Sequence, residues 1–333
     1  MTTEDPTAWV VSKSQTDFGV CTDADDYFHP QEIHPPGASV TETYYFGFSI
    51  PEEKVFAFVY LWLHPNLNVL SGGVLLYQGR KRHFLAANYH NWLDFLSAPD
   101  HINRDNGTVT LPNGLVVKIN KPFQEHELVF EDKQADTRFH VFQRAAMPAA
   151  VRGGNKHFEQ NMKVEGELVL RGKRYRVECH SVRDRSWAEH RPEDSIPVPP
   201  YSWVTLGDEN FAFNIGGFDD MSQYPDHPGI SVPAKLFADG WVCRDGELTR
   251  IVSCTRKTVR DDDLIPLQHV VEATDKLGRQ YTMQGTTVAG CPVGGWKNIV
   301  MQQTLMQWDV NGSRYWGESQ DVHWHEFERL FRK

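Results

Sequence analysis

The chain has few cysteines and no long apolar run. Its 333 residues include five cysteines (Cys21, Cys179, Cys243, Cys254 and Cys291), and no two of them form a Cys-x-x-Cys pair. Such scattered cysteines exclude a disulfide scaffold, give no zinc signature and fit a reducing environment. No stretch of 18 apolar residues occurs, and the first residues lack the basic and apolar segments of a signal peptide. We therefore expect no membrane span and a cytoplasmic location.

Motifs for nucleotide binding and for nucleophilic catalysis are also missing. Neither Gly-x-Gly-x-x-Gly nor a P-loop pattern is present, so we expect no cofactor. No Gly-x-Ser-x-Gly occurs, and no cysteine lies in a recognisable catalytic context. The net charge of −10, from 44 acidic and 34 basic residues, argues against a nucleic-acid surface. The expected partner is a hydrophobic small molecule, and a homodimer stays open.

Long amphipathic helix patterns are nearly absent, whereas strand residues and turn signals are frequent. The chain has 10 Trp, 11 Tyr and 19 Phe, and aromatic residues favour strands and the walls of apolar pockets. Turn sequences such as Asn113-Gly114 and Asn311-Gly312 separate alternating segments. Turns at this spacing predict roughly eight to ten strands in each half, hence an all-β fold of antiparallel barrels or sandwiches. The segment 91–97 is the one place where a short helix is considered.

The stretch 147–155 has little pattern and contains proline and glycine, which predicts a domain boundary. An N-terminal β domain, with an irregular N-terminal arm, is expected over residues 1–150. A C-terminal β domain is expected over residues 156–333. A closed barrel of about eight strands can hold one small ligand in its interior.

The stretch 164–191 combines a hairpin with an unusual charge pattern. Apolar residues alternate around the turn at Gly172, and the return strand continues into Arg183-Asp184-Arg185-Ser186-Trp187. Successive side chains of a strand point to opposite faces, so Asp184 faces away from both arginines. A buried acid must be paired or chemically employed. Two interpretations stay open: Asp184 is a structural acid paired with an arginine, or it takes part in chemistry.

This stretch resembles the signature of a lipocalin-like superfamily that includes carotenoid 1,2-hydratase (hydroxyneurosporene synthase) and kievitone hydratase. The matching residues are Gly166, Gly172, Tyr175, Val177, Asp184 and Trp187. The preceding segment 157–160 also looks like its counterpart in uncharacterised relatives. Two positions depart from the pattern, Ala188 in place of a glycine and Val182 in place of an aromatic residue. The resemblance implies two lipocalin-like halves packed against each other.

Because motifs for nucleotide cofactors and for catalytic nucleophiles are missing, the chemistry that remains is acid–base catalysis. Adding water across a carbon–carbon double bond needs a proton donor, a group that orients water, and aromatic faces that stabilise a carbocation. Burial suits a carboxyl group to be the donor because it raises the pKa, whereas a contact with a neighbouring arginine would lower it. The resemblance favours the donor role for Asp184. The expected catalytic residues are Asp184, His157, Glu159 and Tyr201, and the expected substrate-binding residues are Glu42, Tyr44, Trp62, His64, Trp187, Trp203 and Asn214.

The leading hypothesis is a cofactor-independent hydratase or related lyase. Its expected substrate is a hydrophobic isoprenoid, steroid or prenylated aromatic compound, a class that comes from the resemblance alone. The alternatives are a non-catalytic carrier of lipophilic ligands and a cyclase or pericyclase on the same scaffold. A metal is not expected, since the one candidate cluster, around His323 and His325, lies at the C-terminal end, where a frayed polar tail explains the same residues.

Overall fold

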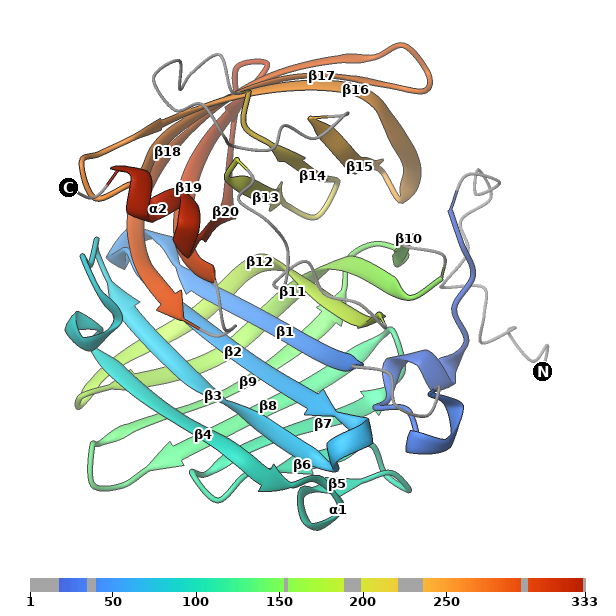
Figure 1. The fold of residues 1–333 in the computed structure, drawn as a ribbon, viewed down its shortest axis with the longest axis vertical. Coiled ribbons are helices and arrows are strands. Elements are labelled where there is room, and N and C mark those ends of the chain that lie inside the picture. Colours follow the sequence, from blue (N-terminus) through green and yellow to red (C-terminus); the bar gives the residue numbers. More distant parts are fainter. Residues whose placement is uncertain are drawn as a thin grey trace.

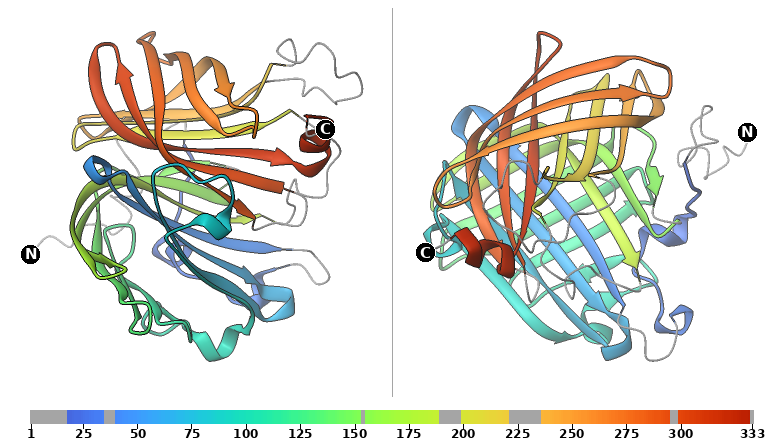
Figure 2. Two further views of the ribbon diagram at one scale, coloured as in Figure 1. Left: turned by 90° about the vertical axis from the view of Figure 1, so that its left-hand side faces the viewer. Right: turned by 45° about the horizontal axis from the view of Figure 1, so that its top comes forward.

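The computed structural model describes residues 18–34, 40–152, 155–188, 199–220, 236–294 and 299–331, and it is built from two stacked β layers (Figure 1). About 68% of the chain is strand and 9% is helix, so the predicted all-β class is confirmed. The barrel formed by the later strands lies over the sheet formed by the earlier ones, and both side views keep this order (Figure 2).

The first layer is a curled antiparallel sheet of 12 strands in the spatial order β4-β3-β2-β1-β12-β11-β9-β8-β7-β6-β5, with β10 paired to β11. Its strands are β1 (Thr41–Ile50), β2 (Val55–His64), β3 (Val69–Gln78), β4 (Tyr89–Ser97), β5 (Ile102–Asn103), β6 (Thr108–Thr110), β7 (Leu115–Lys121), β8 (Glu125–Asp132), β9 (Thr137–Ala145), β10 (Ala150–Arg152), β11 (His157–Leu170) and β12 (Lys173–Ala188). The segment considered for a short helix therefore lies in strand β4.

The second layer is a closed barrel, β13 to β20 in chain order. Its strands are β13 (Tyr201–Gly207), β14 (Phe211–Phe218), β15 (Phe237–Arg244), β16 (Glu247–Arg260), β17 (Pro266–Asp275), β18 (Gln280–Gly294), β19 (Ile299–Val310) and β20 (Ser313–Trp324). The predicted turn at Asn311-Gly312 joins β19 to β20, and both residues have positive φ, 50° and 87°, as a tight two-residue hairpin requires.

Helices are short and peripheral. The α-helices are α1 (Ala98–His101) and α2 (His325–Phe331), and the 3-10 turns are η2 (Asp23–Asp26), η3 (Gln31–Ile33), η4 (Pro51–Glu53), η5 (Pro65–Leu67) and η6 (Phe84–Ala86). Pro51 and Pro65 begin the turns after β1 and β2, and each turn ends on a left-handed residue, Lys54 or Asn68. Within the described ranges, no helix has the length and apolar character that a membrane crossing requires.

The chain changes layers later than the sequence predicted. Strands β11 and β12 pair with β9 and β1 of the first sheet, so the first layer extends to Ala188 and the second begins at Tyr201. The division into residues 1–150 and 156–333 therefore does not follow the two layers. The weakly patterned stretch 147–155 includes strand β10, which pairs with β11 in the first sheet. It gave no sign of this, because backbone pairing across a sheet is not visible in local composition.

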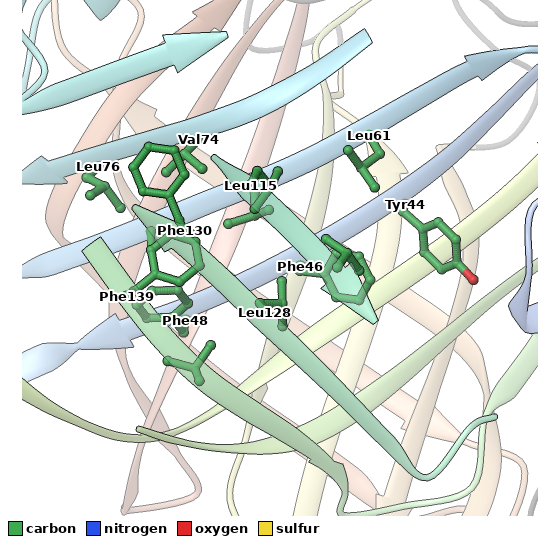
Figure 3. Packing of buried hydrophobic residues seen from close by; sticks show 14 of the residues in the cluster. Tyr44, Phe46, Phe48, Leu61, Val74, Leu76, Leu115, Leu128, Phe130 and Phe139 are labelled. Carbon is green, nitrogen blue, oxygen red and sulfur yellow. The ribbon is translucent and has the colours of Figure 1, made fainter. Parts of the chain in front are cut away.

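The two faces of the first sheet serve different purposes. The inner face carries the largest apolar cluster, which includes Tyr44, Phe46 and Phe48 of β1. Figure 3 shows Phe48 beside Phe130 and Phe139, with Tyr44 farther along β1. The opposite face meets the barrel, and the cluster there joins residues of both layers, among them Tyr45, Tyr60, Trp203 and Trp241. Because side chains alternate along β1, Tyr44 and Tyr45 lie in different clusters.

Candidate active site

A cavity of about 270 Å³ lies between the two layers. One part of its wall is polar and comes mainly from the first sheet, with Arg152, His157, Asp184 and Ser186. The other part comes mainly from the barrel and is aromatic or apolar, with Tyr201, Trp203, Phe218, Ile299, Met301 and Trp324. A mainly apolar hollow with a few convergent polar groups is the usual form of a small-molecule site.

Asp184 faces this cavity from near the C-terminal end of β12. Its direct neighbours across the sheet are Tyr45 of β1 and Glu159 of β11, and Arg183 and Arg185 point to the other face, as the alternation predicted. Arg183 Nη1 lies 2.7 Å from Asp26 Oδ1, and Arg185 donates a hydrogen bond to Glu42. Arg183 and Arg185 are thus paired with acids on the opposite face of the sheet, so neither of them is the ion-pair partner of Asp184.

Both arginine–carboxylate pairs are buried: Arg183 with Asp26 ties the N-terminal segment to the sheet, and Arg185 with Glu42 joins β12 to β1. Asp26 also accepts a hydrogen bond from the backbone N–H of Phe123 at 2.6 Å. Burial raises the pKa of Asp26, but the charge of Arg183 outweighs it and holds the pKa well below its usual range. Arg185 acts on Glu42 in the same direction. Both acids are therefore charged structural groups, because a buried ion pair keeps its members ionised.

Glu159 holds two of the cavity's polar groups in place from behind the wall. Its carboxylate accepts hydrogen bonds from Arg152 and pairs with His157, with Nε2 and Oε1 3.1 Å apart. Burial raises the pKa of Glu159, but Arg152 and the hydrogen bonds from His157 and Trp203 lower it to about 2. An ionised Glu159 cannot donate a proton at neutral pH, but it orients the imidazole as the carboxylate does in other acid–base sites.

Tyr201, at the start of β13, reaches the cavity across a glycine. Its ring meets Phe218 edge to face with centroids 5.1 Å apart, and a Cβ on Gly216 would lie 2.1 Å from its hydroxyl oxygen. The ring can occupy this place because residue 216 has no side chain. Burial raises the pKa of Tyr201, so its hydroxyl stays protonated and can donate a hydrogen bond to a ligand.

The structure gathers five of the predicted residues at the cavity and separates the others from it. Asp184, His157, Tyr201 and Trp203 line the cavity, and Glu159 lies behind it. Glu42 and Tyr44 are on the opposite face of the first sheet with Arg185, and so is Trp187, which packs on the ring of His29 with centroids 5.0 Å apart. Whether these residues act on a substrate stays a prediction, and the cavity gives no support to those on the far face.

Three further predicted residues lie elsewhere. Trp62 lines a second interlayer cavity of about 270 Å³ with Trp92. His64 lies at the end of β2, with Nδ1 3.3 Å from Thr41 Oγ1. Asn214 is fully buried in β14, where its direct partners are Thr205 of β13 and Trp241 of β15. It does not line the first cavity.

Arg152 is a charged cavity residue that sequence reasoning missed, as it missed the aromatic residues Phe218 and Trp324. It is the last residue of β10 and the direct partner of His157 in the neighbouring strand β11. Burial lowers the pKa of Arg152, but Glu159 and other nearby acids, Asp184 among them, raise it above the ordinary value. Its position in the stretch taken for a linker gave no signal, since only strand pairing brings it beside His157.

The histidines near the C-terminus are separated by the change from strand to helix. His323 is buried in β20, with Nε2 2.7 Å from Asp321 Oδ2, while His325 is exposed at the start of α2. Among the residues that the structure describes, no group of three His, Cys, Asp or Glu side chains has the arrangement to hold a metal ion.

Comparison with known proteins gives a family and a fold. A family model described as "Domain of unknown function (DUF7064)" matches residues 22–326. No curated protein matches the chain in sequence.

Solved structures match over nearly the whole chain. Kievitone hydratase from Nectria haematococca has a TM-score of 0.58 at 10% identity, covering 96% of this chain and 97% of that chain. An AttH-type protein from Nitrosomonas europaea has a TM-score of 0.58 at 12% identity, covering 88% and 96%. CghA with Sch210972 has a TM-score of 0.55 at 9% identity, covering 90% and 97%. These likenesses concern the fold, and they confirm the predicted lipocalin-like fold.

Proposed function

We propose that this chain, which belongs to the DUF7064 family, is a cofactor-independent enzyme that adds water to, or removes it from, a carbon–carbon double bond. The proposed substrate is a hydrophobic isoprenoid, steroid or prenylated aromatic compound. One observation carries the proposal: Asp184 and His157 line the same cavity as the aromatic faces of Trp203, Phe218 and Trp324. Fold likeness to kievitone hydratase agrees with this chemistry, but it concerns the scaffold.

The residues divide the steps of hydration between them. A protonated Asp184 gives its proton to one alkene carbon, and the aromatic faces stabilise the carbocation that forms at the other. Water then attacks this carbon and releases its proton to His157. Dehydration runs through the same steps in reverse. Ionised Glu159 orients the imidazole of His157 for this step, with Oε1 and Nε2 3.1 Å apart.

Tyr201 and Arg152 are proposed to orient the substrate. Each presents a hydrogen-bond donor to the cavity, and a hydroxyl or carbonyl oxygen of the substrate is the matching acceptor. A ligand that is apolar throughout would cover the Tyr201 hydroxyl without offering it an acceptor, and an unsatisfied buried donor costs about 1–3 kcal/mol. We therefore expect a substrate with one polar end and an apolar body.

The rival function is a carrier of lipophilic ligands. A carrier of apolar molecules gains nothing from a carboxyl group and an imidazole in its cavity, since an apolar ligand displaces water from polar groups and offers no hydrogen bond in return. The grouping of Asp184, His157 and Arg152 in one wall therefore favours the enzyme.

The test is incubation of the full chain with isoprenoid, steroid and prenylated aromatic alkenes and with their tertiary alcohols in isotope-labelled water. Hydration adds labelled oxygen to the product, and dehydration removes one water from the alcohol. Asp184→Asn should abolish both, while Asp262→Asn, on an exposed turn, should change neither. Binding without any product would support the carrier, and an isomeric product without added water would support a cyclase.

A further inference from the structure

A second carboxyl group lies close to Asp184 but outside the cavity lining. Glu318 of β20 is only 2% exposed and sits where the barrel meets the first sheet. Its Oε2 accepts hydrogen bonds from the hydroxyl of Tyr45 and from Gln303 Nε2, the latter at 2.6 Å. The hydroxyl of Ser181 lies 3.4 Å from Oε1. All three partners are neutral, and within the described ranges no cation lies within ion-pair distance of Glu318.

This environment differs from that of the three buried acids Asp26, Glu42 and Glu159. Asp26, Glu42 and Glu159 each contact an arginine and are ionised, whereas Glu318 has only neutral donors. A buried carboxylate without a cation is costly, so the neutral acid is the favoured form. In agreement with this, burial is the main cause that raises the pKa of Glu318, to about 8.

Tyr45 connects the two acids. It is the direct partner of Asp184 across β1 and β12, so both side chains leave the sheet on the same face. Its hydroxyl reaches Glu318 because residue 47, two positions along β1, is glycine. A Cβ on Gly47 would lie 2.5 Å from the Tyr45 hydroxyl oxygen and 2.9 Å from that of Ser181. The charge of Asp184 also raises the pKa of Glu318.

Glu318 also borders a small cavity of about 10 Å³ that is lined by Ser181, Asn161 and His180. The amide oxygen of Asn161 is buried and accepts no hydrogen bond from a described residue. A space of this size holds roughly one water molecule, and a buried water needs such polar partners. His180 is partly exposed and pairs with Glu209, so this cavity leads from Glu318 towards solvent.

We propose that Glu318 and Asp184 form a coupled carboxyl pair that retains one proton at neutral pH, with Glu318 as the positioning residue that keeps this proton next to the active site. This inference rests on the proposed function. The shared proton passes from Glu318 to Asp184, and Asp184 gives it to the alkene. Glu318 is left as a carboxylate that accepts from Tyr45 and Gln303, and it regains a proton from solvent through the small cavity. Two interacting carboxyl groups titrate as a pair in this way.

The ionisable groups around Glu318 come from three elements. They are Tyr45 on β1, Tyr77 on β3, and Cys179, His180 and Asp184 on β12. Burial raises the pKa of both tyrosines well above 10 and that of Cys179 to about 11. These three groups therefore stay neutral over the range in which Glu318 titrates.

Infrared spectroscopy of the full chain tests the protonation state without any substrate. The difference between wild type and Glu318→Gln should contain the carbonyl band of a protonated carboxyl group at neutral pH, and this band should disappear as the pH rises through about 8. Glu131→Gln, at an exposed position of β8, should give carboxylate bands only. Carboxylate bands for Glu318 at neutral pH would overturn the inference.

Two variants test the coupling. Asp184→Asn removes a negative charge that raises the pKa of Glu318, so the midpoint of the band should move to lower pH. Tyr45→Phe removes a hydrogen bond that lowers this pKa, so the midpoint should move to higher pH. A midpoint that Asp184→Asn leaves unchanged would show that the two acids are not coupled.

Turnover then separates this inference from the proposed function. Glu318→Gln should keep KM near the wild-type value and move the alkaline limb of the pH–rate profile to lower pH, since the retained proton is lost. If the alkaline limb of Glu318→Gln lies at the same pH as that of wild type, Glu318 does not hold the proton that is used in turnover. If no substrate is hydrated or dehydrated while the infrared results hold, the proposed function fails and the coupled pair stands.

Discussion

The indole N–H of Trp241 in the barrel donates a hydrogen bond to the Glu159 carboxylate in the first sheet, with Nε1 and Oε2 2.6 Å apart. Trp203 donates to the same carboxylate. One charged group thus accepts from two barrel strands and orients His157 at the cavity. The contact between the layers and the geometry of the candidate site therefore depend on the same side chain.

Trp241→Phe should lower the free energy of unfolding by about 1.5–3 kcal/mol, because the hydrogen bond involves a charged group and Glu159 is fully buried. Thermal or denaturant unfolding measures this loss. Trp92→Phe is the matched control, since its indole donates to Asp94 at an exposed position. An equal loss in both variants would show that the indole ring, rather than the hydrogen bond to Glu159, is what matters.

The stabilising effect of Glu159 should depend on pH. Its pKa is about 2 in the folded chain, against an ordinary value of 4.5. The ionised group is therefore stabilising above the ordinary pKa, and this contribution is lost as the pH falls from 4.5 towards 2. Glu159→Gln should be less stable than wild type at neutral pH, and the difference should shrink in acid. Melting temperatures across this range check it, and a constant difference would contradict it.

Asp184→Asn should lower turnover and leave stability unchanged, whereas Asp26→Asn should lower stability. Asp184→Asn removes the proposed proton donor, so turnover should fall on the order of a hundredfold or more while the fold survives. Asp26→Asn leaves Arg183 as a buried charge without its acid, which costs roughly 3–5 kcal/mol. Turnover and unfolding are measured on both variants. A large loss of stability in Asp184→Asn with normal activity in the folded fraction would remove Asp184 from the mechanism.

Gly216→Ala should reshape the cavity without changing its chemistry. The new methyl group would meet the Tyr201 hydroxyl at 2.1 Å, so the ring must move and the wall at Phe218 changes with it. We expect weaker ligand binding, seen as a raised Kd for a hydrophobic fluorescent probe. Gly294→Ala is the control, because a Cβ there meets nothing within 4 Å. Unchanged probe binding in Gly216→Ala would place the ligand away from Tyr201.

The sequence by itself determined the strands and much of the candidate site. Alternation of side chains and glycine turns depend on neighbouring residues only, so they predicted the all-β class and the hairpin at Asn311. The same alternation placed Asp184 opposite Arg183 and Arg185. It could not supply the partners of those arginines, because Asp26 and Glu42 lie more than a hundred residues away along the chain.

Only the tertiary structure decided what lies between the layers. Arg152 meets His157 through the pairing of β10 with β11, and Glu318 meets Tyr45 through the packing of the barrel on the sheet. The end of the first layer at Ala188 depends on the pairing of β12 with β1. The local sequence of one segment does not predict its contact with the other, since strand pairing and layer packing are set by the whole fold.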